Sequence, residues 1–238
     1  MTSQTTDPTE VLLSVQSARD FDLSADPESL IWRDAPPVTI GLTFNGDSLA
    51  GAPTTVRSRW TRSSLYILYA CPYDVLTLRP ELDLTRKTPY LWNWDVAEAF
   101  IGSDVERIGI YKEFQVSPRG EWVDLAIDRD HPDLDQALSW TSGFRVKAHV
   151  AESKREWYGE MCIPFATIDP RPPQPGHELR LGLFRLSGHD PRTLHLWRPT
   201  GRPNFHVPEA FGRLRLVAAE QGNSRPSLVD SRPGCRIT

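Results

Sequence analysis

Residues 108–128 read IGIYKEFQVSPRGEWVDLAID, and this stretch contains two alternating runs of apolar and polar residues joined by a turn. In the first run, Phe114 and Val116 alternate with Glu113 and Gln115. Side chains point to opposite faces along a strand, so alternation with a period of two predicts β-strands. The segment Ser117-Pro118-Arg119-Gly120 is typical of a tight turn, so the whole stretch predicts an antiparallel hairpin. The side chains of the second run that we expect to face inward are Val123, Leu125 and Ile127.

Similar runs recur on both sides of this hairpin. They cover residues 38–44, 64–71 and 96–101 upstream, and residues 144–150, 157–163, 179–186 and 212–217 downstream. Helical spacing is seen in residues 133–140, where Leu134 and Leu138 lie four positions apart. The chain also has 21 prolines and 15 glycines, which suit frequent turns between short strands. We therefore expect an all-β fold, an antiparallel β-sandwich of jelly-roll-like form with only short helical turns.

The apolar content of the chain sets the expected domain boundaries. We expect one domain, with the β-sandwich in residues 23–217 and an N-terminal segment, residues 1–22, partly paired to its sheet. Residues 218–238 are poor in apolar side chains, so we expect a disordered C-terminal tail.

Composition and charge exclude several classes of protein. Of 238 residues, 39% are hydrophobic and 24% are charged, as in an ordinary globular domain. A net charge of −4 gives no overall attraction to nucleic acid or to an anionic membrane. No apolar run approaches the roughly 20 residues that span a bilayer. The polar N-terminus lacks the features of a signal peptide, so we expect a cytoplasmic location, or secretion if the true start lies upstream.

Familiar catalytic and metal-binding motifs do not occur in the sequence. It has no nucleophile elbow, phosphate-binding glycine loop or metal-binding cysteine cluster, and its six histidines lack the i, i+4 spacing of a zinc helix. Cys71 and Cys162 lie in apolar runs and are expected to be buried free thiols, while Cys235 lies in the polar tail. We therefore assign no catalytic residue and no cofactor, and the metal content stays open.

Two aromatic segments, far apart in the sequence, are candidates for a binding site. Leu91-Trp92-Asn93-Trp94-Asp95 comes directly before the strand that contains Glu98, and Pro203-Asn204-Phe205-His206 comes much later. The C–H face of a sugar ring packs on an aromatic ring, and its hydroxyl groups need fixed donors and acceptors, which amides and carboxylates provide. The same rings could instead belong to the core, since large aromatic side chains are mostly buried.

The order of motifs along the chain resembles a family 9 carbohydrate-binding module, within the broader DOMON-like group of β-sandwiches. The resemblance extends from about residue 23 to residue 217. The features that carry it are, in order, Trp32, residues 65–69, residues 95–100, residues 111–120 with Asp124, residues 160–165, residues 183–185, Trp197 and residues 206–212.

The resemblance implies non-catalytic carbohydrate binding, linked to carbohydrate catabolism, in which two aromatic rings hold a sugar end or a small saccharide. By position, Trp92 is similar to the first ring, Phe205 to the second and Glu98 to the carboxylate of the family. Gln115 stands where the family has an arginine, which removes a charged donor.

Further ligand-binding candidates lie near these positions. Arg185 or Arg202 could supply the missing guanidinium, and Asn93 and His206 stand beside the rings. Some members of the family bind calcium at loop sites, whose ligands we do not assign in this chain. The expected partners are a saccharide and, because such modules are often appended to hydrolases, a glycoside hydrolase.

Other interpretations of the same residues stay open. An enzyme could use carboxylates such as Glu98, Glu113 or Asp124 for glycoside hydrolysis. A haem-binding DOMON-type domain would need axial ligands, typically methionine and histidine, and Met161 lies in a strand expected to be core. The sugar site could also have decayed.

Three polar residues have structural interpretations beside the functional ones. Glu160 and Arg185 are expected to form an ion pair between strands, and Asp95 a hydrogen-bonding group at the start of a strand.

Overall fold

The computed structural model describes residues 10–219 and confirms an all-β fold in which the helices are short. The twelve strands of this part of the chain are β1 (Val11–Gln16), β2 (Val38–Ile40), β3 (Thr54–Trp60), β4 (Ser64–Pro72), β5 (Val96–Gly102), β6 (Ile110–Val116), β7 (Trp122–Asp128), β8 (Arg145–Ala151), β9 (Glu156–Pro164), β10 (Glu178–Ser187), β11 (Thr193–Leu196) and β12 (Gly212–Val217). The helical elements are α1 (Leu134–Ser139) and the 3-10 turns η2 (Leu30–Trp32), η3 (Leu91–Asn93), η4 (Glu152–Lys154), η5 (Phe165–Thr167) and η6 (Pro208–Ala210). None of these helical elements is long and apolar enough to cross a membrane.

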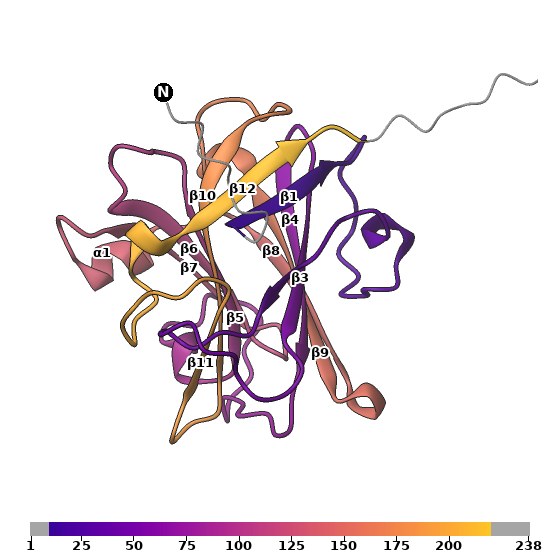
Figure 1. Ribbon diagram of the computed structural model, residues 1–238, viewed down its shortest axis with the longest axis vertical. Coiled ribbons are helices and arrows are strands. Elements are labelled where there is room, and N and C mark those ends of the chain that lie inside the picture. Colours follow the sequence, from indigo (N-terminus) through magenta and orange to yellow (C-terminus); the bar gives the residue numbers. More distant parts are fainter. Residues whose placement is uncertain (1–9, 220–238) are drawn as a thin grey trace, which may run out of the picture.

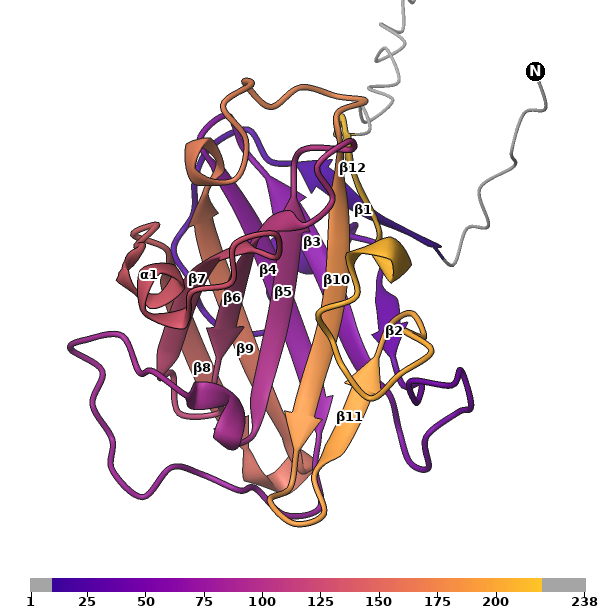
Figure 2. The same ribbon diagram turned by 90° about the vertical axis from the view of Figure 1, so that its left-hand side faces the viewer.

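The strands form one hydrogen-bonded sheet that folds over into a sandwich. Their order is β7-β6-β5-β10-β12-β1-β3-β4-β9-β8, with β11 added to β10 and β2 added to β3. One layer contains β7, β6, β5, β10 and β11, and the other contains β8, β9, β4, β3 and β2 (Figure 2). Strands β12 and β1 join the two layers along one edge (Figure 1).

Strand β1 differs from the antiparallel prediction. It lies between β12 and β3 and runs parallel to both, with Leu12 opposite Leu214 and Ser14 opposite both Leu216 and Ser58. Residues 11–16 belong to the segment 1–22, which the sequence predicted to be partly paired to the sheet of the sandwich. The segment predicted as a C-terminal tail, apart from residues 218 and 219, lies outside the described residues.

Besides β1, strands β3 and β11 were not predicted, for different reasons. In β3, Ser58 occupies a buried position that an apolar side chain would normally fill. Its hydroxyl donates to Ser14 Oγ at 2.9 Å, and Ser58 is 0% exposed. The alternation of apolar and polar residues is therefore lost in this strand. Strand β11 has only four residues, which is too short for a clear period. The predicted run 38–44 also ends early, because the regular strand stops at Ile40 and continues only as an isolated bridge at Leu42.

The main core lies between the two layers. It contains large buried side chains from both of them, among them Ile67, Phe114, Trp157 and Leu183. Cys71 also belongs to this core, and it and Cys162 are buried free thiols, as predicted. Cys235 lies outside the described residues.

A second apolar cluster covers the outer face of the β7-β6-β5-β10 layer and corrects one prediction. Val123 and Leu125 do not face the main core; they share the outer face with Gln115 and Glu113, their register partners on β6. The period of two was right, but it cannot tell which face of a strand is covered when both are. Here α1 packs on β7 from outside, so the apolar side chains of β7 are buried there (Figure 2).

Residues 133–140 contain the predicted helix. Asp133 caps it, its side chain accepting a hydrogen bond from the Gln136 N–H at 2.9 Å. The outer face of the opposite layer is closed differently, by packing of Trp32 and its neighbours against Tyr66 and Cys162. A polar pocket lies on the outer face of the β7-β6-β5-β10 layer, between α1 and the β11–β12 connection.

Candidate functional site

A pocket of about 320 Å³ opens on the outer face of the β7-β6-β5-β10 layer. Its polar floor comes from adjacent strands: Glu98 on β5 is the register partner of Gln115 on β6, and Glu113 lies two residues before Gln115 on the same face. Glu98, Glu113 and Gln115 are 2%, 3% and 1% exposed. These three side chains are therefore shielded from solvent at the bottom of an open pocket.

The walls come from segments far apart in the sequence. Figure 2 looks onto this face, with α1 over β7 on one side and the yellow β11–β12 connection in front of β10 on the other. The remaining lining residues are Trp92, Leu125, Ile127, Leu134, Leu186, Arg192, Leu194, Pro203, Asn204, Phe205 and His206.

Trp92 reaches the pocket because the chain turns sharply before it. Tyr90 has left-handed backbone geometry, with φ of 61°, and leads directly into η3. The rings of Tyr90 and Trp92 then pack edge to face, with centroids 5.3 Å apart. Trp92 is half-buried, so part of its ring is available at the rim of the pocket.

Phe205 lies in the same pocket but is more deeply packed. Its ring stacks on that of Phe184 with centroids 4.3 Å apart and planes at 10°, and the residue is 7% exposed. Phe205 therefore joins the apolar cluster of the outer face while one part of its surface lines the pocket. Of the two rings, Trp92 is therefore the more exposed and Phe205 the more buried.

His206 connects the β11–β12 connection to the floor. Its Nδ1 lies 2.7 Å from the Tyr111 hydroxyl, and its Nε2 lies 3.9 Å from Glu113 Oε2. Burial, with a smaller effect from Arg129, lowers the pKa of His206 to about 4. The imidazole is therefore neutral near pH 7.

The floor carboxyl groups are electrostatically unusual. Burial raises the pKa of Glu113 to about 8, although a hydrogen bond donated by Gln115 Nε2 to Glu113 Oε1 opposes the shift. Burial, together with repulsion from Glu113, also raises the pKa of Glu98, while Arg192 opposes this rise. Near neutral pH the pair therefore retains a proton that two exposed glutamates would have lost.

Two oxygen atoms of the floor are buried without a hydrogen-bond partner. They are Glu98 Oε1 and Gln115 Oε1. Leaving a buried acceptor unpaired costs about 1–3 kcal/mol. A molecule that brings donors into the pocket would recover this cost, so the arrangement suits a ligand rich in O–H or N–H groups.

Arg192 was not predicted as a site residue. It lies in the connection between β10 and β11, and its Nη2 donates to the Asn93 carbonyl at 3.4 Å. Asp95 holds the same connection in place, because its Oδ1 accepts a hydrogen bond from the Gly188 N–H at 2.8 Å. This confirms the structural role expected for Asp95 at the start of a strand. No periodic pattern marks Arg192, whereas Glu113 could have been found by its even spacing from Gln115.

Three predicted residues lie elsewhere. Arg185 is on the other face of β10 from Phe184, is 3% exposed and donates to Thr54 Oγ1 at 3.1 Å. Asn93 contributes its backbone carbonyl to Arg192 but does not line the pocket, and Arg202 is exposed outside it. The structure thus brings Trp92, Glu98, Gln115, Phe205 and His206 together and leaves the other three out.

The predicted ion pair between Glu160 and Arg185 is wrong. Glu160 Oε2 instead accepts hydrogen bonds from the backbone N–H groups of Ser24 and Ala25, at 2.8 and 2.6 Å. The two backbone donors satisfy Oε2, while Oε1 is buried without a hydrogen-bond partner.

Asp124 and Met161, which the sequence offered as candidates for other functions, lie away from the pocket. Asp124 lies on the opposite face of β7 from the pocket, 0% exposed, with Lys87 Nζ 2.6 Å from its Oδ1. Of the three carboxylates considered for hydrolysis, only Glu98 and Glu113 therefore share the pocket. Met161 is 0% exposed within the main core, the position expected for it.

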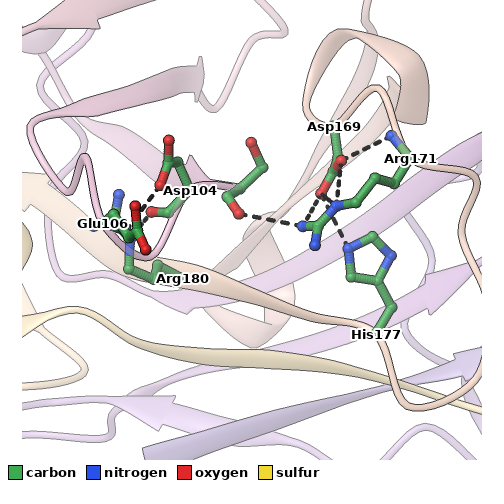
Figure 3. A network of polar contacts seen from close by, with 7 residues as sticks. Asp104, Glu106, Asp169, Arg171, His177 and Arg180 are labelled. Atoms are coloured by element: carbon green, nitrogen blue, oxygen red, sulfur yellow. Dashed lines mark hydrogen bonds and ion pairs between the residues drawn. The ribbon is translucent and has the colours of Figure 1, made fainter.

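A polar network at one end of the sandwich connects two loops (Figure 3). Asp169 lies 2.6 Å from Arg171 Nη2 and 3.0 Å from His177 Nε2, and Arg171 also reaches the Ser103 carbonyl. On the other side, Arg180 Nε donates to the Asp104 carbonyl at 2.9 Å. The polar groups of this network bind one another, so its role is to fasten the β5–β6 and β9–β10 loops.

A larger cavity, of about 680 Å³, lies elsewhere, beside the loop of residues 41–53 and the far side of β11. Small and apolar residues form most of its lining, and His195, which lines it, binds Ser187 Oγ at 2.7 Å. It therefore has less convergent polar chemistry than the pocket at Glu98. Within residues 10–219, no group of three or more His, Cys, Asp or Glu side chains is placed to hold a metal ion.

Comparison with known proteins places the chain in a family. Residues 27–219 match the family described as carbohydrate family 9 binding domain-like. The chain is also 23% identical over 142 residues to a protein named "Extracellular protein" from Arthroderma benhamiae. That match covers 53% of this chain and 63% of the relative, so the chain spans less than two thirds of the relative's length.

Solved structures share the fold. A putative carbohydrate-binding protein from Bacteroides uniformis has a TM-score of 0.65 at 14% identity, covering 87% of this chain and 99% of that one. A family 9 carbohydrate-binding module from Caldicellulosiruptor kristjanssonii, in complex with cellotriose, has a TM-score of 0.58 at 15% identity and covers 94% of this chain and 100% of that one. The glucose complex gives 0.57 at 16% identity, with coverage of 90% and 100%. These likenesses concern the β-sandwich, and the match over residues 27–219 shows that the chain belongs to the carbohydrate family 9 binding domain-like family.

Proposed function

We propose that the pocket above Glu98 and Gln115 binds the end of a saccharide chain or a small saccharide, without catalysing a reaction. The observation that carries this proposal is the pair of buried, unpartnered oxygens on the pocket floor, Glu98 Oε1 and Gln115 Oε1. A sugar hydroxyl can donate to each of them. Membership of a carbohydrate-binding family supports the same assignment, as do the saccharides in the titles of the Caldicellulosiruptor structures.

The walls of the pocket suit the two kinds of surface that a sugar presents. The half-buried ring of Trp92 offers a flat apolar surface at the rim for the C–H face of a pyranose. Arg192 and the side-chain amide of Asn204 can donate to ring and hydroxyl oxygens. A volume of about 320 Å³ lies at the lower end of the roughly 300–1,000 Å³ usual for ligand pockets, which favours one or two sugar units.

Titration calorimetry on the intact chain tests this function. Glucose, cellobiose and cellotriose are titrated into the native protein and into Glu98→Gln. We expect the variant to weaken binding by at least about tenfold, because the amide replaces one carboxyl oxygen with an N–H group and so leaves a sugar hydroxyl without its acceptor. Glu81→Gln is the matched control, because the Glu81 side chain is 84% exposed and bound only to Arg79, and its affinity should be unchanged.

The proposal is overturned if the folded native protein binds no saccharide, either in calorimetry or on a glycan array. Equal weakening by Glu81→Gln and Glu98→Gln would also count against the pocket as the site.

We further propose a glycoside hydrolase as the working partner and sugar-polymer breakdown as the setting. Family membership supports this link, since a binding module contributes by holding a substrate near an enzyme. Hydrolysis of an insoluble glucan by a hydrolase, with and without the intact protein, tests it: a rate increase that Glu98→Gln abolishes is expected. An unchanged rate would contradict it.

A further inference from the structure

The floor of the pocket offers more hydrogen-bond acceptors than donors. Glu98 Oε1 and Gln115 Oε1 are buried and unpartnered, and Glu113 Oε2 has only the neutral His206 near it, at 3.9 Å. One of the two N–H groups of Gln115 Nε2 is already used by Glu113 Oε1, so the Gln115 amide has one donor left. A ligand that fits this floor must therefore bring several donors to one place.

The ionisable groups of the pocket are also unbalanced, because acidic side chains outnumber basic ones. Within residues 10–219, neither Glu98 nor Glu113 has a lysine or arginine nitrogen within 4.0 Å. Arg192 is the cation of the lining, and its Nε is itself buried without a partner. Two carboxyl groups thus face one guanidinium, and His206 adds no charge while it is neutral. Arg129 lies behind His206 and lines the neighbouring cavity rather than this one.

The two carboxyl groups can reach a common ligand group. Glu98 pairs with Gln115 and Phe100 with Glu113, so the two glutamates are diagonal neighbours on one face of the sheet. Diagonal neighbours lie roughly 7–8 Å apart at the backbone, within reach of long side chains. A single group bound between their oxygens would then contact both.

We infer that the preferred ligand of the pocket is an amino sugar whose amine is protonated, with the ammonium group bound between Glu98 and Glu113. This inference rests on the proposed saccharide function and names its ligand class. An ammonium group supplies three donors and no acceptor, which matches the floor. Its positive charge favours the ionised form of both carboxyl groups, so its binding displaces the proton that the pair retains in the empty pocket. The remaining hydroxyls meet Gln115 and Arg192, and the sugar ring packs on Trp92.

A neutral sugar fits the same floor less well. Each of its hydroxyls donates one hydrogen but adds an oxygen that needs a donor, and the floor has few to offer. An N-acetylated amino sugar has lost the charge and two of the three donors, so it belongs with the neutral sugars.

Titration calorimetry at about pH 7, where amines are still mostly protonated and the Glu98–Glu113 pair is partly ionised, tests the inference. Glucose, glucosamine and N-acetylglucosamine are titrated into the intact protein. We expect glucosamine to bind at least about tenfold more tightly than either of the others, a difference of about 1.4 kcal/mol. The preference should shrink at high salt, because part of it is the attraction between charges.

Two variants of opposite sign keep the inference falsifiable. Glu113→Gln should reduce the preference for glucosamine to about twofold or less, because an amide cannot release a proton to become a carboxylate and has one acceptor oxygen instead of two. Arg192→Gln should increase the preference, because it removes the opposing cation. Glu81→Gln serves again as the exposed control, and thermal melts show that each variant is folded.

The outcomes separate this inference from the proposed function. Binding of glucose as tight as that of glucosamine, or a preference that Glu113→Gln leaves intact, would overturn the amino-sugar assignment while leaving saccharide binding in place. Absence of binding for all three sugars, together with a glycan array that detects none, would overturn both.

Discussion

Glu98 and Gln115 face each other across neighbouring strands, and each retains one buried oxygen that no group of the described chain satisfies. This arrangement does not stabilise the fold, since an apolar pair at the same positions would avoid the free-energy cost of two unpaired buried acceptors. The cost is recovered only when something else enters the pocket. The pair is therefore the part of the fold that a ligand explains best.

Trp92→Ala should affect binding more than folding. Trp92 is half-buried at the rim, so its removal takes a surface from the ligand but leaves the main core intact. We expect saccharide affinity to fall by at least about tenfold, or 1.4 kcal/mol. Calorimetry and a thermal melt on the same sample measure both effects. Unchanged affinity in a stable variant would remove Trp92 from the site.

Phe205→Ala should affect folding more than Trp92→Ala does. Phe205 is 7% exposed and stacks on Phe184, so truncation leaves a cavity in the outer apolar cluster. Truncating a buried phenylalanine costs about 3–5 kcal/mol. Chemical denaturation of the two variants side by side provides the comparison. A smaller loss of stability for Phe205→Ala than for Trp92→Ala would show that the burial contrast is wrong.

The stability of the protein should fall as the pH rises through the titration of Glu113. The pKa of this group is about 8 in the folded chain and 4.5 for an ordinary glutamate. An acid with a raised folded pKa binds more protons in the folded state between these values, so its contribution is full below pH 4.5 and is lost as the pH rises through about 8. His206, whose pKa is lowered to about 4, acts in the opposite direction below about pH 6.5.

Subtracting a variant isolates the Glu113 effect. Melting temperatures of the native protein and of Glu113→Gln are measured from pH 5 to about pH 9, a range that includes the titration. The native protein should lose stability relative to the variant as the pH increases. Parallel curves for the two proteins would contradict the raised pKa of Glu113.

Asp124→Asn should destabilise the fold without changing the pocket. Asp124 is 0% exposed and pairs with Lys87 Nζ at 2.6 Å, so the change leaves a half-buried lysine without its counter-ion. Breaking a buried ion pair on one side costs about 3–5 kcal/mol. Asp83→Asn, at the largely exposed pair with Arg86, should leave the denaturation midpoint almost unchanged. Denaturation midpoints test both, and equal midpoints would contradict a structural role for Asp124.

Much of the sandwich could be predicted because its strands alternate regularly. The hairpin of β6 and β7 and strands β4, β5, β9 and β10 have apolar side chains at every second position or in continuous runs. Strand β3 was not predicted because its buried Ser58 forms a hydrogen bond with another serine, Ser14, across the sheet instead of packing as an apolar residue. A serine has no hydropathic signal, and only the three-dimensional partner explains its burial.

The site could be predicted only in part, because a pocket depends on which faces meet. Even spacing within β6 places Glu113 and Gln115 together, but nothing in the sequence says that Arg185 faces the main core while Arg192 reaches the pocket. That distinction requires the pairing of β10 with β5, in which Phe184 is opposite Glu98 and so puts Arg185 on the other side. Long-range register of this kind carries no local signature.

The position of β1 makes the sheet depend on residues that the family match does not include. The match begins at residue 27, whereas β1 ends at Gln16 and forms the only link between β12 and β3 in the strand order. A fragment cut at residue 27 would have two open strand edges next to each other, and such edges pair readily with other chains. A synthetic peptide spanning residues 10–17 should fill this slot and restore a monomer. Such restoration would show that β1 can close the sheet without a covalent link to it, and a label carried on the peptide would then report assembly of the sandwich.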